Sequence, residues 1–351
     1  MGSHHHDKHR QHVFGLALIL LAVAALAAVL IIVNANNPAT GDSAVKSTPA
    51  VLTESPREDI GTATSVVWNG QRYRRRPNQE LVLLIGYDAE GNATDKPFQG
   101  ARGDFLLLVV LDHHDRAVNF LQIDRDTVAR MNTYDRFGQR NGSRMYPITL
   151  SHSFRLTMAE KDANTRETVE NLLHLKIDAT ASMGMDSIEK FNDGIGGVTV
   201  TLRDDMTVLG EKFAGYEKGA AVTLTGDMTE AYVRARKGIT SGNNHNRMLR
   251  QRDYIHAFIR QVETRIKENA GFLNTLDALL RENILLTSNY GRGWIYTTLN
   301  KIYSQHYTIS DPVILDKNGS EDRSPENWRL FYLNDDEVVE WTLATLYRPD
   351  N

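Results

Sequence analysis

Aspartate and arginine residues stand at the ends of apolar segments in the first half of the sequence. Asp88 closes one apolar run, and Arg102 and Asp104 precede a second. Arg125 and Asp126 follow a third. Ligands of α/β proteins are often held outside the strand ends. Two carboxylates beside arginines suit a divalent cation with an anionic ligand, because Mg²⁺ binds one or two carboxylates and leaves its other positions to water and phosphate.

The polar stretch 112–117 separates the second and third apolar runs. In a hairpin that is symmetric about this stretch, Asp104 and Arg125 lie opposite each other, because each is about ten positions from the centre. The alternative is a plain cross-strand ion pair, which contributes less than about 1 kcal/mol when it is exposed. The spacing alone leaves both interpretations open.

A second basic group occurs further along the chain, with six cations within 19 residues. Arginine offers phosphate oxygens a planar fork that lysine cannot match. Arg247 and Gln251 are four positions apart and share one face of a predicted helix. The alternative is a helix with acidic residues in its first turn and cations in its last, which matches the helix dipole. The group comprises Arg234, Arg236, Lys237, Arg247, Arg250 and Arg252.

A sheet and several helices are predicted to position these residues. Continuous apolar runs are typical of strands that are buried on both faces, and apolar residues at helical spacing predict helices. Strands flanked by helices, without a repeat, indicate one α/β domain with a covered sheet. A hairpin is predicted at 66–73. The other predicted strands are 81–86, 105–111, 118–123 and 198–202, and the predicted helices are 165–175, 226–237, 246–267 and 335–347.

Composition excludes several classes of protein. The chain has 351 residues, 40 Lys and Arg against 44 Asp and Glu, and no cysteine. Without cysteine there is no disulfide framework, no CxxC zinc site and no thiol nucleophile. A formal net charge of -4 argues against general binding of nucleic acid.

The segment 13–33 contains 21 residues without a charge, which is long enough to cross a bilayer. Lys8 and Arg10 precede it and predict a cytoplasmic N-terminus, so that the rest of the chain faces outwards. The predicted organisation is a cytoplasmic tail (1–12), a retained transmembrane helix (13–33), an extracytoplasmic linker (34–65) and a catalytic domain (66–351). We therefore expect a single-pass protein of the cell membrane.

Six short motifs, taken in order, resemble the LytR–CpsA–Psr family of membrane-anchored cell-wall ligases. The resemblance extends from about residue 68 to residue 347, and it implies a single α/β domain with a central mixed sheet flanked by helices. The motifs are LLIGYD (83–88), ARGD (101–104), DRDT (124–127), GIGGVTV (194–200), LTGDMTEAYVRAR (224–236) and RMLRQ (247–251).

The resemblance implies a phosphotransferase that moves a glycopolymer from a polyprenyl-pyrophosphate carrier to peptidoglycan, where it forms a phosphodiester with the muramic acid 6-hydroxyl. Asp88 and Asp104 would bind Mg²⁺ or Mn²⁺, and the prenyl chain would lie in an apolar pocket between sheet and helices. Arg102, Asp104 and Arg125 would carry the catalysis. The pyrophosphate would be held by Arg102, Arg125, Arg234, Arg236, Arg247 and Gln251.

Two positions depart from the pattern of the family. Asn244 stands where an acidic residue is usual, and 144–147 (RMYP) replaces a lysine and small residues. Asn244 gives weight to one alternative to the ligase, a non-catalytic protein that binds lipid-linked glycan or wall polymer. A second alternative is a pyrophosphate hydrolase, in which water replaces the acceptor sugar. The sequence does not distinguish teichoic acid from capsule or other wall glycans.

Overall fold

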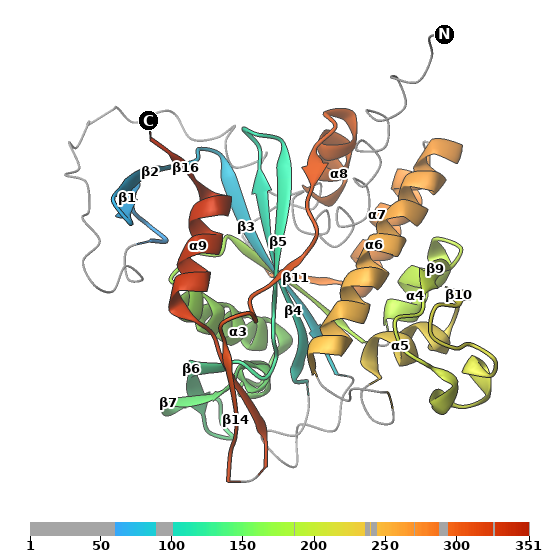
Figure 1. Ribbon diagram of the computed structural model, residues 1–351, viewed down its shortest axis with the longest axis horizontal. Coiled ribbons are helices and arrows are strands. Elements are labelled where there is room, and N and C mark those ends of the chain that lie inside the picture. The colour runs from blue at the N-terminus through green and yellow to red at the C-terminus, as the bar shows by residue number, and fades with distance from the viewer. Residues whose placement is uncertain are drawn as a thin grey trace.

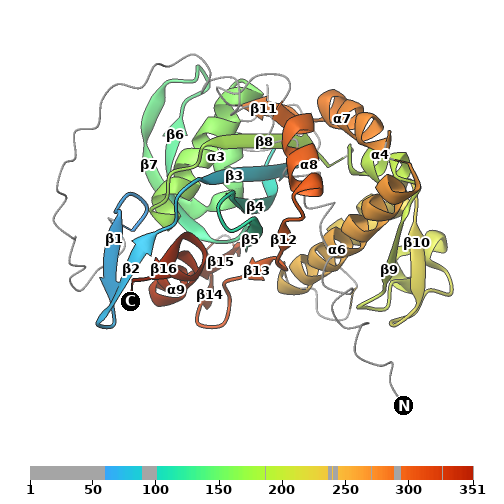
Figure 2. The ribbon, with the colours of Figure 1, turned by 90° about the horizontal axis from the view of Figure 1, so that it is seen from above.

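The computed structural model describes residues 60–88, 101–185, 187–235, 239, 244–269, 271–287, 294–325 and 327–350. Its central strands are β3 (Gln79–Tyr87), β4 (Gly103–Asp112), β5 (Ala117–Ile123), β8 (Ala179–Gly184), β11 (Leu285–Thr287), β12 (Thr308–Ile309) and β13 (Val313–Ile314). Among the described residues these seven strands form one sheet in the order β11-β8-β3-β4-β5-β12, and β13 also pairs with β5 (Figures 1 and 2). The sheet is mixed, because β4 is antiparallel to β3 and β5 whereas β8 is parallel to β3.

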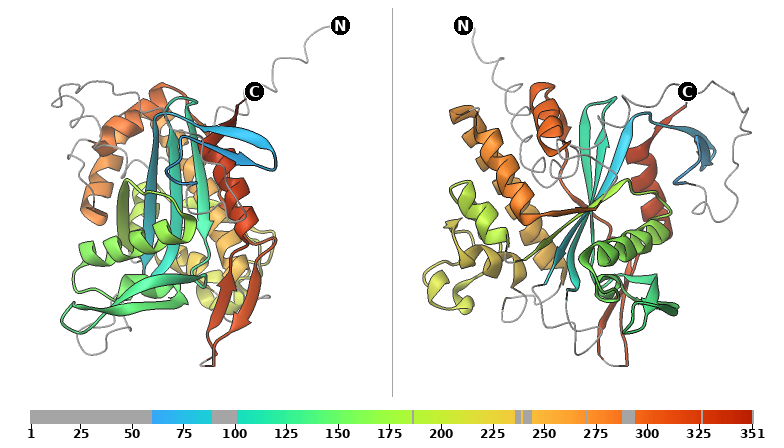
Figure 3. Two further views of the ribbon diagram at one scale, coloured as in Figure 1. Left: turned by 90° about the vertical axis from the view of Figure 1, so that its left-hand side faces the viewer. Right: turned by 180° about the vertical axis from the view of Figure 1, so that it is seen from behind.

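Helices cover both faces of this sheet (Figure 3). The first face, called the α6 face below, packs against α4 (Ser187–Gly194), α5 (Asp227–Arg234), α6 (Asn244–Glu268), α7 (Phe272–Asn283) and α8 (Trp294–Ser304). The second, the α3 face, packs against α3 (Met158–Leu173) and α9 (Asp335–Leu346). Two hydrophobic cores result, one on each side of the sheet.

The continuous apolar runs of the sequence follow from this double cover. Val82 and Leu84 on β3 belong to the core on the α6 face, whereas Leu81, Leu83 and Ile85 belong to the core on the α3 face. Successive side chains of a strand point to opposite faces, so a strand covered on both sides has no polar alternation. The predicted α/β class, the covered sheet and the three central strands are confirmed.

Smaller elements surround the central sheet. One three-stranded sheet contains β1 (Ser65–Trp68), β2 (Gln71–Arg75) and β16 (Tyr347–Pro349). The paired strands are β6 (Val128–Tyr134) with β7 (Arg140–Pro147), β9 (Val198–Thr201) with β10 (Ala221–Leu224), and β14 (Ser320–Arg323) with β15 (Arg329–Tyr332). Short 3₁₀ helices are η1 (Ile148–Ser153), η2 (Thr207–Leu209) and η3 (Glu211–Phe213). Seen from above, β6 and β7 lie beside α3, across the sheet from α6 (Figure 2).

The predicted boundaries are correct in part. The hairpin at 66–73 is β1 and β2, but the fold already includes Ile60, which is 1% exposed in the core of the α3 face. Helix α3 begins at 158 rather than 165, because Thr157 and Glu160 form a capping box. The predicted membrane span at 13–33 lies outside the described residues. Within the part of the chain that is described, no helix has the length and apolarity to cross a membrane.

Candidate functional site

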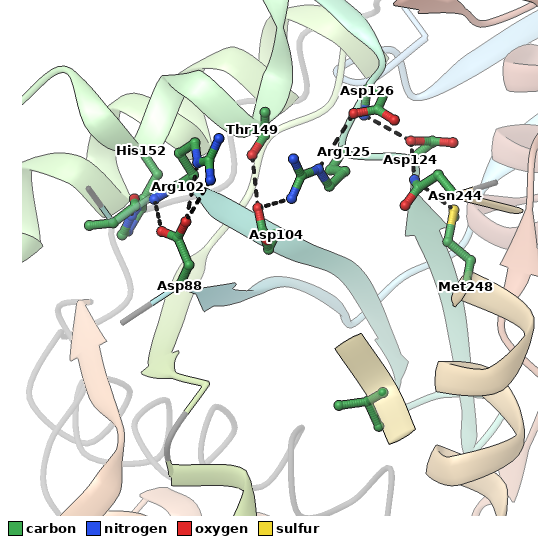
Figure 4. Close-up of polar contacts among 12 residues, drawn as sticks. Asp88, Arg102, Asp104, Asp124, Arg125, Asp126, Thr149, His152, Asn244 and Met248 are labelled. Carbon is green, nitrogen blue, oxygen red and sulfur yellow. Dashed lines mark hydrogen bonds and ion pairs between the residues drawn. The ribbon is translucent and has the colours of Figure 1, made fainter. Parts of the chain in front are cut away.

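The strand ends at which β4 begins and β5 finishes bring the predicted acidic and basic residues together (Figure 4). The ladder between β4 and β5 ends with Leu106 paired to Ile123, and extending its register by two residues places Asp104 opposite Arg125. Arg125 Nη1 forms an ion pair with Asp104 Oδ1, and the two side chains are only 13% and 12% exposed. The predicted cross-strand arrangement is confirmed, and the pair is more buried than an ordinary surface ion pair.

A β-bulge sets the orientation of the Asp104 side chain. Gly86 pairs with Phe105 and Tyr87 pairs with Gly103, so Asp104 has no opposite residue on β3. Bulges of this kind redirect a side chain and are frequent beside active sites. Thr149, in η1, donates its Oγ1 hydrogen to Asp104 Oδ1 at 3.2 Å. The Asp104 carboxylate is therefore held by an arginine from β5 and a hydroxyl from η1.

A second carboxylate–arginine pair lies beside the first. Arg102 donates its backbone N–H to Asp88 Oδ1 at 2.6 Å, and its Nε and Nη2 donate to Asp88 Oδ2 at 3.1 Å each. The Asp88 side chain is 12% exposed, whereas that of Arg102 is 42% exposed. Such charge-assisted, forked contacts fix the orientation of both groups. Arg102 is therefore the member of the pair that can reach a ligand.

A buried histidine supports the turn that carries Arg102. His152 Nδ1 donates to the carbonyl oxygen of Ala101 at 2.6 Å, and Ala101 has a positive φ of 54°. His152 Nε2 lies 2.9 Å from Asp162 Oδ1, and Ser182 Oγ donates to Asp162 Oδ2 at 2.8 Å. His152 and Asp162 are fully buried. Sequence reasoning did not select His152, because its two partners are distant in the chain.

Asp124 connects the site to α6. Its side chain points towards Asn244 of α6, whereas the side chain of Arg125 points towards Asp104 (Figure 4). Asn244 Nδ2 and the backbone N–H of Asp126 both donate to Asp124 Oδ1. Burial raises the pKa of the Asp124 carboxyl, and the nearby charge of Asp126 raises it further, against the positive charge of Arg247. Asn244 thus holds a carboxylate that sequence reasoning did not select.

We expect Asp124→Asn to increase thermal stability at neutral pH. Because its pKa is raised on folding, Asp124 contributes stability that is present below its unfolded pKa and lost as pH rises through its folded pKa. The charge is therefore unfavourable at pH 7, and the gain in Tm should shrink as pH falls. Asp205→Asn is the control of opposite sign, because hydrogen bonds from Thr207 lower the pKa of Asp205. A lower Tm for Asp124→Asn than for wild type at pH 7 would contradict the prediction.

The described members of the second basic group have different surroundings. Arg247 is 5% exposed in the first turn of α6 and lies close enough to Asp124 to lower its pKa. Arg234 is 43% exposed at the end of α5, where it pairs with Glu230. Arg250 is buried and binds Asp204 and two carbonyl groups of the α5 region, so its role is structural. Arg236 lies outside the described residues.

Gln251 is buried and already has hydrogen-bond partners. Its Oε1 accepts from Gln122 Nε2 at 2.7 Å, and its Nε2 donates to the carbonyl of Val233 at 3.2 Å. These bonds connect β5, α6 and α5. The predicted contact of Gln251 with pyrophosphate stays a prediction.

An apolar pocket lies on the α6 face next to the two carboxylate–arginine pairs. Phe105, which follows Asp104, and Gly86, which precedes Asp88 by two residues, both line it. Gln251 also forms part of the wall. The pocket is bounded by β3, β4 and β8 on one side and by helices on the other, and its apolar lining includes Leu84, Ala181, Met183, Tyr254, Ile255 and Phe258. A charged site thus adjoins a cavity suited to a hydrocarbon chain.

This fold and site define an α/β protein that can hold an anionic group next to an apolar chain. The chain belongs to the LytR_cpsA_psr family, whose model matches residues 42–320. The family predicted from the six motifs is therefore confirmed.

Two curated relatives and one crystal structure illustrate the similarity. Polyisoprenyl-teichoic acid–peptidoglycan teichoic acid transferase TagU of Halalkalibacterium halodurans is 27% identical over 180 residues, which are 51% of this chain and 52% of the relative. The TagV transferase of Bacillus subtilis is 27% identical over 209 residues, 59% of this chain and 49% of the relative. The chain thus spans about half the length of the curated relatives it matches. The crystal structure of B. subtilis TagV aligns with a TM-score of 0.57 at 23% identity, over 76% of this chain and 95% of that chain, and shows a shared fold.

Proposed function

We propose that this protein transfers a glycopolymer from a polyprenyl-pyrophosphate carrier to peptidoglycan and forms a phosphodiester with the muramic acid 6-hydroxyl. The observation that carries the proposal is the position of the Asp88–Arg102 and Asp104–Arg125 pairs beside an apolar pocket. A lipid-linked pyrophosphate needs both parts. The names of the curated relatives, which are teichoic acid transferases, support the same reaction class.

The donor would bind with its prenyl chain between the sheet and α6 and its pyrophosphate at the strand ends. Arg102 and Arg125 would turn from their carboxylates to the phosphate oxygens, which their planar forks match. Arg247 lies beside Asp124 on the α6 side, and Arg234 is exposed at the end of α5. Both belong to the proposed pyrophosphate set, together with Gln251 and Arg236.

We propose Asp88 and Asp104 as ligands of Mg²⁺ or Mn²⁺. Both offer hard oxygen ligands, Asp88 just after β3 and Asp104 on the neighbouring β4, and Mg²⁺ commonly binds one or two carboxylates together with phosphate oxygens and water. Within the described part of the chain, no group of three or more His, Asp or Glu residues could hold a metal ion. A bound cation would offset phosphate charge and free the two arginines from their carboxylates.

Catalysis would depend on positioning and charge stabilisation rather than on a nucleophile from the protein. The acceptor hydroxyl oxygen forms a bond to the phosphorus that carries the glycan, and the bond from that phosphorus to the bridging oxygen breaks. Polyprenyl phosphate leaves with the bonding electrons. The hydroxyl proton passes to a carboxylate of the site, for which Asp104 and Asp88 are the candidates. Arg102 and Arg125 stabilise the charge that develops on the phosphate oxygens.

The proposed reaction requires a location at the outer surface of the cytoplasmic membrane. The apolar segment 13–33, preceded by Lys8 and Arg10, supports a single membrane anchor with the catalytic domain outside. Such an anchor would keep the pocket near the lipid carrier and the strand ends near peptidoglycan.

Turnover of a defined donor tests the proposal. Full-length protein with a polyprenyl-pyrophosphate glycan, Mg²⁺ and peptidoglycan should release polyprenyl phosphate and attach the glycan. Removing the cation with a chelator or replacing Asp104 by Asn should lower the rate by about 10²-fold or more. Asp350→Asn is the matched control, because Asp350 forms only an exposed ion pair with Arg74.

The same assay distinguishes the alternatives. Donor binding without product in any condition would contradict the transferase and support a non-catalytic binding protein. Release of polyprenyl phosphate at an equal rate without peptidoglycan, with no attached glycan, would instead identify a pyrophosphate hydrolase.

A further inference from the structure

The hairpin formed by β6 and β7 carries a net positive charge. Residues 128–147 contain four arginines, no lysine and one acidic residue, Asp135, in a chain whose net charge is -4. All four arginines are exposed. We call this two-stranded element, whose arginines lie on both of its faces, the arginine hairpin. It is defined by Arg130, Arg136, Arg140 and Arg144.

The charges of the arginine hairpin are not neutralised within the fold. Among the described residues, none of its four arginines forms an ion pair with a carboxylate. Arg136 lies over the ring of Phe137, at 4.7 Å from its centroid. The carboxylate of Asp135 instead accepts the backbone N–H groups of Phe137 and Gln139 and so closes the turn. The surface therefore attracts an anion from outside the protein.

The arginine hairpin is attached directly to the candidate site. At its base, the N–H of Ile148 donates to the carbonyl of Thr127 at 2.7 Å, and the N–H of Thr149 donates to the carbonyl of Arg125 at 3.0 Å. Thr149 also binds Asp104. Met131 is buried in a small cluster with Leu150 and Phe154, which fixes the hairpin. The seven residues of β6, at about 3.4 Å each, extend roughly 24 Å outwards from the site.

The position of the hairpin relative to the apolar pocket indicates the direction in which a bound donor extends. The residues that line the pocket place it on the α6 face. The hairpin lies beside α3, on the other side of the sheet (Figures 1 and 2). A donor whose prenyl chain fills the pocket and whose pyrophosphate lies at the strand ends therefore continues towards the hairpin. The part of the donor that reaches the hairpin is the glycopolymer.

We propose that the arginine hairpin binds the glycopolymer of the donor and that this polymer carries phosphodiester groups. This inference rests on the proposed function. Arginine rather than lysine at all four positions favours phosphate, because the guanidinium fork binds two of its oxygens. The hairpin thus selects anionic donors by charge and holds the chain while its pyrophosphate end reacts.

Binding of a soluble polymer tests the hairpin without any turnover. The probe is poly(glycerol phosphate), compared with neutral dextran of the same length and with soluble peptidoglycan fragments, on full-length protein. Arg130→Gln/Arg144→Gln should weaken binding of poly(glycerol phosphate) about tenfold or more at low salt. High salt should remove most of the difference, because exposed charges are screened. The matched control is Arg72→Gln/Arg348→Gln, which removes the same charge from exposed positions on β2 and β16.

Three results would overturn the proposal. They are an equal loss in both double variants, equal affinity for dextran, and a loss confined to the peptidoglycan fragments. A transfer assay adds a second criterion, the KM for a long anionic donor divided by the KM for a single-disaccharide donor. This ratio should be about tenfold higher for the hairpin variant than for wild type. An unchanged ratio would contradict it. If wild-type protein transfers neither donor, the proposed function fails, whereas the binding result still decides the role of the hairpin.

Discussion

Replacing Arg125 by lysine is expected to lower kcat for glycopolymer transfer about 10²–10³-fold, the usual effect of removing one group that stabilises transition-state charge. Arg125 is 13% exposed, its Nη1 contacts Asp104, and its Nε lies 3.4 Å from Asp126. Lysine keeps the positive charge between these carboxylates but loses the planar fork. The loss should therefore appear in kcat, measured by release of polyprenyl phosphate, more than in the affinity for the donor.

The control for Arg125→Lys is another forked arginine outside the site. Arg203 donates from Nε and Nη2 to the two oxygens of Asp253, at 2.8 and 2.9 Å. Arg203→Lys loses the same geometry, and we expect it to leave kcat within about twofold because the pair is partly exposed. A kcat for Arg125→Lys within about threefold of wild type, with Tm unchanged, would show that the fork does not act in the transition state.

The parts of the site that could be predicted from sequence depend on local regularity. Asp104 and Arg125 were placed opposite each other because a hairpin has a centre, and positions equidistant from it must pair. Asp88 and Arg102 followed from the same reasoning about strand ends. The strands themselves were visible because a doubly covered sheet leaves continuous apolar runs.

The parts that could not be predicted depend on contacts between distant segments. No spacing rule joins His152 to Ala101 and Asp162, or Asn244 to Asp124. The bulge at Asp104 leaves no signature in its apolar neighbours. Counting charges likewise overestimated how many cations of the second basic group are available to a ligand, because Arg250 forms an ion pair with Asp204 inside the fold. Sequence therefore located the charged end of the sheet, whereas tertiary contacts determine which groups support it.

Filling the apolar pocket should separate stability from activity. Ala181 is 3% exposed on β8 and lines the pocket with Leu84 and Phe258. We expect Ala181→Phe to maintain or raise Tm, because filling a cavity commonly adds about 0.5–2 kcal/mol to the free energy of unfolding. The same ring would displace part of the prenyl chain. At about 0.8 kcal/mol per buried methylene, excluding four of them lowers kcat/KM roughly 10²-fold.

Two donors and one control variant make this prediction specific. A donor with a prenyl chain of only two or three isoprene units should lose less than one with a long chain, because it fills less of the pocket. Ala181→Ser changes the polarity but hardly the volume, so its effect on both donors should be small.

A fall in Tm of several degrees in Ala181→Phe would instead indicate overpacking of a closed core. Equal losses on both donors would show that the prenyl chain binds elsewhere. A lipid-binding pocket predicts an unchanged or raised Tm together with a loss of kcat/KM that grows with the length of the prenyl chain. Enlarging a residue of a closed core would lower the free energy of unfolding. Enlarging a surface residue would not make kcat/KM depend on the length of the prenyl chain.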